Sequence, residues 1–200
     1  MIRRLAARLL LPLVLAFAFV PAAAARAPDI ADDARNPPPP VALSSFDRFR
    51  VEPIAMSEEI ARHKGNVVAR QYLQVDLDER VPKLIEPWNA RESTTGRTLL
   101  VKPEVEAIRF ITGGKRLLAG GFAGNSWAVL RLRLVDADSG ELIAEPRFYQ
   151  RAHGIFAGYS LGAADKLMLA RLSDMAAAYL RDNFDAPRGS TVATSTAKMD

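Results

Sequence analysis

The chain alternates apolar and polar residues with a period of two in three stretches, at residues 46–56, 97–111 and 128–152. A period of two is typical of strands that bury one face. The last stretch shows it most clearly, because leucine and arginine alternate there up to a turn sequence at residues 136–140. Two alternating runs around a turn rich in Asp, Ser and Gly predict a hairpin, with Gly140 at positive φ.

The same pattern predicts which side chains face the core. In the second stretch Leu99, Val101, Val105 and Ala107 share one face, and from Ile108 onwards the apolar set changes parity to Ile108 and Phe110. A single inserted residue has this effect, so we predict a β-bulge at residues 107–108. On the return strand of the hairpin, the residues expected on the buried face are Leu142, Ala144 and Phe148.

Apolar residues recur at helical spacing in two longer segments, 66–90 and 163–184. The first contains Pro82 and Pro87, which predict a kink or a break because proline removes a helical hydrogen bond. The second predicts an amphipathic helix whose Met, Leu, Ala and Tyr residues face the core.

The order strand, helix, three strands, helix predicts an α+β domain. We expect a two-layer sandwich, with a mainly antiparallel sheet of about four strands and both helices packed on one face. The opposite face then carries charged residues and is either exposed to water or receives a partner. The residues expected on this face are Glu104, Glu106, Arg131 and Arg133.

The first 25 residues match the pattern of a secretory signal peptide. The basic residues Arg3, Arg4 and Arg8 precede a short apolar run at residues 9–20 and a group of small residues. The run is shorter than the roughly 20 residues that a membrane-spanning helix needs. We therefore expect residues 1–25 to be removed and the mature protein to be periplasmic or secreted, with a retained anchor as the alternative.

Composition sets the expected limits of the folded part. Residues 26–45 are rich in proline and predict a stiff linker. Residues 186–200 are small and polar, which predicts a disordered tail. The remaining segment, 46–185, has the length of one ordinary domain.

Charge and cysteine content exclude several classes of protein. The formal net charge is +4, and removing residues 1–25, with three arginines and no acid, takes it to +1. The mature chain therefore lacks the basic excess of a nucleic-acid-binding protein. The chain has no cysteine, which excludes disulfides, thiol nucleophiles and the lipid-modified cysteine of a bacterial lipoprotein.

A glycine-rich apolar stretch at residues 111–127 is the most unusual feature. It lacks the G-x-x-x-x-G-K-[ST] spacing of a phosphate loop, and strand character rather than a helix follows it. We expect an irregular excursion at 113–124 that packs back on the core, contacts a partner or a membrane, or is simply flexible. The candidate partner-binding residues are Leu117, Leu118, Phe122 and Trp127.

Residues typical of catalytic or metal sites occur without the companions that such sites need. His63 and His153 are the only histidines, and no cluster supplies a third metal ligand. Asp136 and Asp138 lie in a turn that lacks the rest of an EF-hand loop. Ser160 stands in a G-x-S-x-G sequence, but no histidine follows it. We therefore predict no catalytic, cofactor-binding or metal-binding residue, and no enzyme.

The segment 99–152 resembles exported bacterial proteins of the domain of unknown function 4410 family, or a close cousin. The likeness lies in a strand that leads into a glycine-rich apolar loop, and in a later strand that ends in a D-x-x-x-G turn, here Asp136 to Gly140. More loosely it extends over residues 46–184. Many such proteins are lipoproteins, whereas this chain has no cysteine. The resemblance implies an accessory or binding role and transfers no catalytic residue.

Together these observations favour a non-enzymatic periplasmic binding domain of the cell envelope that acts through protein–protein contacts. The expected partner is an envelope protein, with peripheral membrane contact as a further interpretation and nucleic acid excluded. The alternative is a small-molecule or lipid carrier in which residues 113–124 form an apolar lid. No cofactor is expected in either case.

Overall fold

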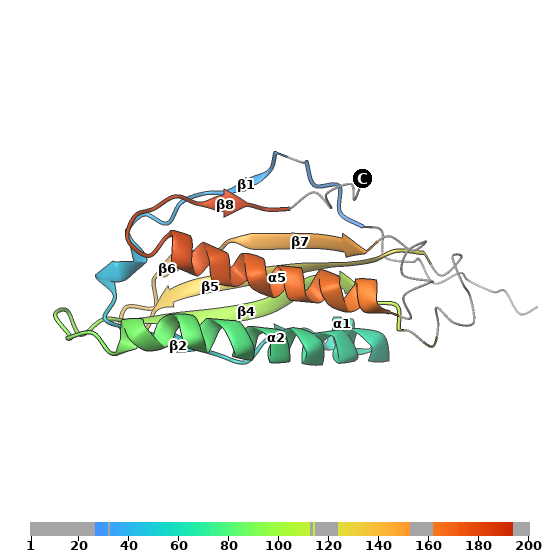
Figure 1. Ribbon diagram of the computed structural model, residues 1–200, viewed down its shortest axis with the longest axis horizontal. Coiled ribbons are helices and arrows are strands. Elements are labelled where there is room, and N and C mark those ends of the chain that lie inside the picture. The colour runs from blue at the N-terminus through green and yellow to red at the C-terminus, as the bar shows by residue number, and fades with distance from the viewer. Residues whose placement is uncertain (1–26, 32, 113, 115–123, 153–161, 194–200) are drawn as a thin grey trace, which may run out of the picture.

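The computed structural model describes residues 27–31, 33–112, 114, 124–152 and 162–193. These residues form the α+β sandwich that the sequence predicts, with two long helices on one face of a sheet (Figure 1). A short ribbon made by the two ends of the described chain lies beside the sheet.

Helical elements separate four groups of strands along the described chain. The helical elements are the 3-10 turn η1 (Leu43–Ser45), α1 (Glu58–Ala61), α2 (Lys64–Asn89) and α5 (Ala163–Asp182). The strands of the main sheet are β2 (Arg48–Val51), β3 (Ala55–Met56), β4 (Thr98–Arg109), β5 (Ser126–Asp136), β6 (Leu142–Ala144) and β7 (Arg147–Ala152). The end ribbon consists of β1 (Arg35–Asn36) and β8 (Ser190–Thr191).

Within the described residues the main sheet has six strands, more than the four that the sequence predicts. β2 and β3 both pair in parallel with β4, and β6 and β7 both pair antiparallel with β5. The sheet is therefore four strands wide, with each outer position filled by two short strands in succession. Pro53 separates β2 from β3, and Pro146 separates β6 from β7. The two long central strands, β4 and β5, pair antiparallel.

The core lies between the sheet and the two helices. Alternate residues of β4 and β5 point into it, which is why leucine and valine recur there with a period of two. The α2 stripe uses every fourth residue, as a helix with one buried face requires. The main buried contributors are Leu73, Leu77 and Val81 on α2, Leu99, Val101 and Val105 on β4, Leu130, Leu132 and Leu134 on β5, Phe148 on β7, and Met168, Leu172 and Tyr179 on α5.

A bulge in β4 confirms the predicted change of parity, one residue earlier than expected. Val105 pairs with Leu130 and Ala107 pairs with Val129, so Glu106 is the extra residue. Beyond it Ile108 becomes the buried side chain. The bulge thus keeps the apolar residues of β4 on the helix-covered face.

A second bulge, in β6, overturns the expected placement of Leu142. Leu134 pairs with Ala144 and Val135 pairs with Leu142, so Ile143 is the extra residue. Ile143 is buried, whereas Leu142 is 46% exposed on the opposite face. The prediction that Leu142 is buried was wrong because two adjacent aliphatic residues compete for one inward position.

Helix α2 continues through both prolines, so the predicted break does not occur. Pro82 and Pro87 are exposed, and the carbonyl groups whose helical partners they remove belong to Asp78 and Lys83. On a solvated face water can satisfy these carbonyls. The buried stripe on the other side of the helix is uninterrupted.

The two terminal segments fold onto the domain, which corrects the predicted linker at 26–45 and disordered tail at 186–200. β1 and β8 pair antiparallel, and the backbone N–H of Tyr149 on β7 donates to the carbonyl of Val192 at 2.8 Å. Burial raises the pKa of Tyr179 to about 12, and its hydroxyl donates to the carbonyl of Pro37 at 3.3 Å. The edge of β7 needs hydrogen-bond partners, and these segments supply them. The rest of both predicted segments (26, 32 and 194–200) lies outside the described residues.

Asparagine side chains cap both outer edges of the sheet. Asn89 accepts from the N–H of Phe49 at 2.7 Å and donates to its carbonyl at 3.0 Å. Asn36 does the same with Arg147, at 2.8 Å in both directions. Each amide takes the place of a neighbouring strand at that residue. A partner that adds a strand at either point would have to displace a hydrogen-bonded side chain.

Replacing Gly189 by alanine is expected to open the end ribbon. Gly189 has φ +69°, and an added Cβ would overlap the carbonyl oxygen of Asn36. Gly140 has a similar φ of +72° but open space around it, so Gly140→Ala is the matched control with about 1 kcal/mol of backbone strain alone. Urea denaturation should show a clearly larger loss for Gly189→Ala, and proteolysis should cut near both ends. Equal losses would show that the ribbon is not held at this point.

Candidate functional site

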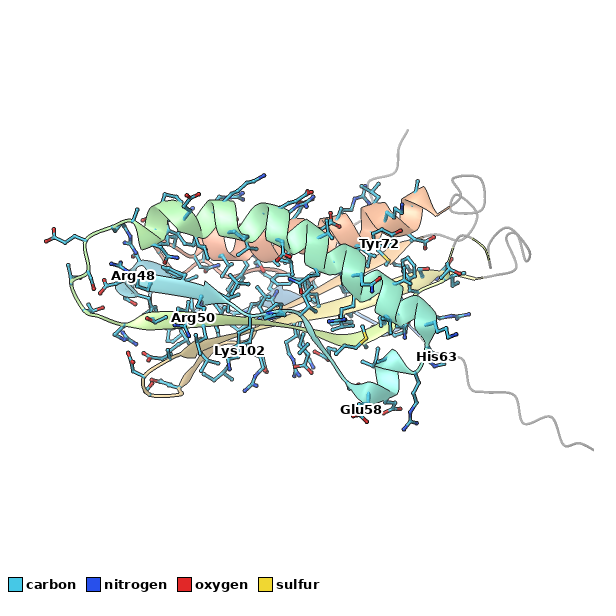
Figure 2. The ribbon with its side chains drawn as sticks, turned by 90° about the horizontal axis from the view of Figure 1, so that it is seen from below. Arg48, Arg50, Glu58, His63, Tyr72 and Lys102 are labelled. Carbon is cyan, nitrogen blue, oxygen red and sulfur yellow. The ribbon has the colours of Figure 1, made fainter. Side chains whose placement is uncertain are left out.

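The sheet face away from α2 and α5, which we call the open face, carries an array of charged side chains. Cross-strand register places Lys102 beside Arg133, and Glu104 beside Arg131 and then Arg147. In Figure 2 the helices lie above the sheet and Lys102 projects from the opposite side. The sequence prediction of a charged face opposite the helices is therefore confirmed.

Ion pairs organise the centre of the open face. Arg131 contacts Glu104 at 2.8 Å and approaches Glu106 and Glu145 at 3.9 and 3.7 Å. The hydrogen bond from Arg131 to Glu104 raises the pKa of the guanidinium. The neighbouring pairs are Arg147–Glu106 at 2.5 Å, Arg133–Glu145 at 3.3 Å and Lys102–Glu52 at 3.1 Å. Exposed pairs of this kind contribute about 0–1 kcal/mol each, so the network orders the surface more than it stabilises the fold.

A row of aliphatic side chains crosses one end of the open face. Leu100 on β4 pairs with Val135 on β5, which pairs with Leu142 on β6. Arg50 on β2 pairs with Leu100 and extends the row to the sheet edge. We call Leu100, Val135 and Leu142 the aliphatic row. The β6 bulge creates it, because it turns Leu142 outward.

The other end of the open face is covered, which corrects one predicted partner-binding residue. Trp127 and Val129 alternate with the inward residues of β5 but are only 4% and 6% exposed. Trp127 is therefore not accessible to a partner. The other three candidates, Leu117, Leu118 and Phe122, lie outside the described residues, as does the apolar lid predicted at 113–124 apart from its glycines 114 and 124.

A buried carboxylate fixes the loop next to the aliphatic row. Asp47 is 5% exposed and accepts from the backbone N–H groups of Thr94, Thr95 and Gly96 at 3.1, 2.6 and 2.5 Å. The hydroxyl of Ser93 donates to it as well, at 3.0 Å. Burial acts to raise the pKa of Asp47, but the hydrogen bonds from Thr95, Gly96 and Thr94 outweigh it and hold the pKa well below its usual value.

The turn that was weighed as a calcium site is a hairpin turn. Asp136 accepts from the N–H groups of Asp138 and Ser139 and pairs with Arg97 at 2.7 Å. The Arg97 guanidinium lowers the pKa of Asp136. Gly140 has the predicted positive φ. In the described chain, no group of three acidic or histidine side chains is placed to hold a metal ion.

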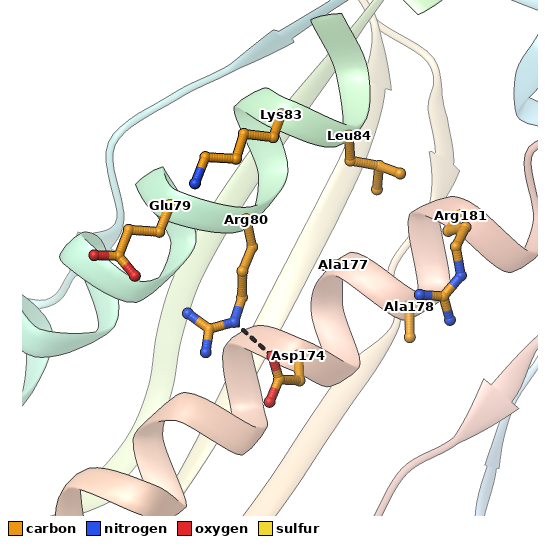
Figure 3. A pocket seen from close by; sticks show the side chains of 8 residues that line it. All are labelled: Glu79, Arg80, Lys83, Leu84, Asp174, Ala177, Ala178 and Arg181. Carbon is orange, nitrogen blue, oxygen red and sulfur yellow. Dashed lines mark hydrogen bonds and ion pairs between the residues drawn. The ribbon is translucent and has the colours of Figure 1, made fainter. Parts of the chain in front are cut away.

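The helix layer carries a shallow groove between α2 and α5 (Figure 3). Its volume is about 490 Å³, and the Arg80–Asp174 ion pair of 2.5 Å spans it. A second groove of the same volume lies between α2 and the β2 edge. The first is lined by Glu79, Arg80, Lys83, Leu84, Asp174, Ala177, Ala178 and Arg181, and the second by Val51, Glu52, Pro53, Arg70, Gln74, Asp78 and Pro82.

Of the remaining residues considered for chemistry, His63 alone lies in the described part of the chain. His63 is exposed at the start of α2, and His153 and Ser160 lie outside the described residues. None of the helices that the structure describes is long and apolar enough to span a membrane.

Sequence reasoning missed Asp47, Arg50 and the outward placement of Leu142. Asp47 stands between two buried phenylalanines, and a lone acid there is a signal for a buried carboxylate. The hydrogen-bond partners of Asp47 lie more than 40 positions away in the sequence. The position of Asp47 therefore does not indicate which residues bind it. Arg50 can be recognised as part of the site only from the strand register, which places it beside Leu100.

No protein-family model matches the chain, and no curated protein matches it. The solved structures similar to it include the following three. A candidate lipoprotein from Caulobacter crescentus is 14% identical over 70% of this chain and 90% of its own, with a TM-score of 0.30. The PelC dodecamer from Paraburkholderia phytofirmans is 16% identical over 67% and 89%, with a TM-score of 0.31. A hypothetical protein from Chlamydia trachomatis is 8% identical over 68% and 98%, with a TM-score of 0.36. Similarity at this level carries no argument about activity or partners.

Proposed function

We propose that this chain is an exported, non-enzymatic accessory domain of the bacterial cell envelope that acts through protein–protein contacts. The amino-terminal pattern of a signal peptide and the resemblance to exported envelope proteins support export. The observation that carries the binding role is the open face. The helices leave it uncovered, and its charged side chains are held in place by ion pairs.

The capped edges of the sheet favour the open face as the contact surface. Asn36 and Asn89 occupy hydrogen-bonding positions at the two edges, so strand addition there is obstructed. The open face combines a charged centre with the aliphatic row at one end. Protein interfaces likewise combine an apolar contact with polar groups beside it.

The grooves of the helix layer do not favour the carrier alternative. A lipid or small apolar ligand needs an enclosed, mostly apolar cavity. Both described grooves are open, and charged side chains line much of each. Leu117, Leu118 and Phe122 remain a second candidate contact surface. The cross-linking experiment described below tests this surface as well.

Processing of the chain provides a first test. We expect the mature protein to begin near Arg26, because small residues precede this position as signal peptidase requires. Intact mass measurement of the protein from periplasmic or secreted material checks this. Protein that retains Met1 in membrane fractions would contradict it and would support a retained anchor.

Lysine-directed cross-linking in the native host tests the binding role. Lys102 lies on the open face, whereas Lys83 and Lys166 lie on the helix layer. We expect mass spectrometry to identify one envelope protein joined through Lys102. A partner joined only through Lys115 would point to the glycine-rich stretch instead. If no partner is recovered, or if all links start from Lys83 and Lys166, the proposed role of the open face is wrong.

A further inference from the structure

We propose that the aliphatic row, together with Arg50, is the docking point for a protein segment that presents an apolar side chain next to a carboxylate. This inference rests on the proposed function and specifies the chemistry of the partner. The row consists of Leu100, Val135 and Leu142, which are neighbours across three strands.

The exposure of the row results from a specific backbone feature. Leu142 is 46% exposed, and Leu100 and Val135 are half-buried. If β6 continued regularly from the Leu134–Ala144 pair, Ile143 would pair with Val135 and face outward, whereas the bulge gives this outward position to Leu142 and turns Ile143 inward. Bulges often re-aim a side chain at a functional position. The three side chains together form a contact that an apolar residue of a partner can cover.

The surroundings of the row hold it in a fixed position. Arg50 and Leu100 lie two residues beyond the starts of β2 and β4, where the Asp47 carboxylate binds three successive N–H groups of the connecting loop. Val135 precedes Asp136, which is paired with Arg97. A surface that is already ordered loses little conformational entropy when a partner binds.

The charged residues around the aliphatic row indicate which polar group of the partner would lie next to its apolar side chain. Lys102 and Arg133, in the next row, are already paired with Glu52 and Glu145. Arg50 is exposed, and within the described ranges it has no ion-pair partner. A guanidinium binds a carboxylate through two parallel hydrogen bonds, which fixes orientation as well as adding attraction. A partner carboxylate next to the apolar side chain would meet Arg50.

The acidic residues of the open face disfavour two other occupants of the aliphatic row, a membrane surface and a second copy of this chain. Glu52, Glu104 and Glu145 stand on the same face as Arg50, so a flat anionic membrane surface would meet negative as well as positive groups. A second copy of this chain offers no unpaired carboxylate among these three, because each already has a basic partner. A different protein can place one carboxylate opposite Arg50.

Selection from a phage-displayed library of random dodecapeptides against the full mature chain tests this proposal. We expect enriched peptides to share a large apolar residue next to Asp or Glu. Their affinity should fall by about tenfold or more for Leu142→Ser and for Arg50→Glu. Leu167→Ser is the matched control, because Leu167 is 52% exposed but lies on helix α5. It should leave the affinity unchanged, and circular dichroism should show that all three variants are folded.

Each alternative has its own outcome, and each would overturn the proposal. Enriched peptides that bind Leu142→Ser as well as the wild type would show that the row is not the docking point. Leu142-dependent binding to vesicles of phosphatidylglycerol and phosphatidylethanolamine would identify a membrane surface, and a dimer lost in Leu142→Ser would identify a second copy. If cross-linking through Lys102 recovers an envelope protein equally well with Leu142→Ser, the proposed function stands and this inference fails.

Discussion

Replacing Leu132 by alanine is expected to lower the free energy of unfolding by about 2–5 kcal/mol. Leu132 is 1% exposed in the middle of β5, and its side chain points into the core between the sheet and the helices. The substitution removes buried apolar surface and leaves a cavity, because neighbours on both layers cannot fully collapse into the space. Urea denaturation at neutral pH measures the loss.

The next residue along the strand supplies the control. Arg133 points to the open face and forms one ion pair there, so Arg133→Ala should cost less than about 1 kcal/mol. The pair of variants compares the two faces of one strand at adjacent positions. A large loss for Arg133→Ala as well would show that the open face is covered in the folded protein and is not free to receive a partner.

Replacing Asp47 by asparagine is expected to cause the largest loss of stability among the carboxylate-to-amide substitutions. One carboxylate oxygen accepts from the N–H groups of Thr94, Thr95 and Gly96 as well as from two hydroxyls. A neutral amide is a weaker acceptor, and its NH₂ group meets donors instead of acceptors. Thermal unfolding at neutral pH should begin several degrees lower, whereas Asp185→Asn, at an exposed aspartate, should have little effect.

The pH dependence of the Asp47 effect has a defined sign. The pKa of Asp47 is lowered in the folded protein, so the folded state favours the charged form. The resulting stability is fully present above the unfolded pKa of about 3.9 and is lost as the pH falls towards the folded value. The difference between the wild type and Asp47→Asn should therefore shrink below about pH 4. A difference that stays constant down to about pH 2 would contradict a charge-dependent role.

Local periodicity was sufficient to predict the layers of this fold. The bulge in β4 could be predicted because Val105 and Ile108, two large apolar residues expected to face the core, lie on opposite parities. The bulge in β6 could not, because Leu142 and Ile143 are adjacent aliphatic residues and either can face inward. Only the register with β5 decides between them, and register depends on pairing that a single segment does not encode.

Contacts between distant segments account for the errors at the two ends of the chain. β1 and β8 have two residues each and lie more than 150 positions apart. Two-residue strands leave no periodic signal. Considered alone, the proline-rich first segment predicts a stiff linker, and the small polar residues of the last segment predict disorder. They are ordered because β7 provides an edge to pair with and Asn36 reaches its backbone. Similarly, α2 accommodates two prolines because both lie on its exposed side.

The candidate site was predicted only in outline. Alternation of Leu and Arg on β5 indicated a charged face opposite the helices, and the structure confirms it. The aliphatic row could not be found from the sequence, because Leu100, Val135 and Leu142 belong to three strands and are brought together by cross-strand pairing. Trp127 is a candidate from the sequence because an apolar residue of the glycine-rich stretch is unexpected in a water-exposed loop, but its position in β5 buries it.

The most direct test of the central claim, that the open face binds an envelope partner, is a comparison of two leucine-to-serine variants in the native host. Leu142 and Leu167 have similar exposure but lie on the open face and on the helix layer. The yield of the partner cross-linked through Lys102 is measured for each variant against the wild type. We predict that Leu142→Ser loses most of the cross-linked partner and that Leu167→Ser retains it. Retention by Leu142→Ser together with loss in Leu167→Ser would place the binding surface on the helix layer and contradict the proposed role of the open face.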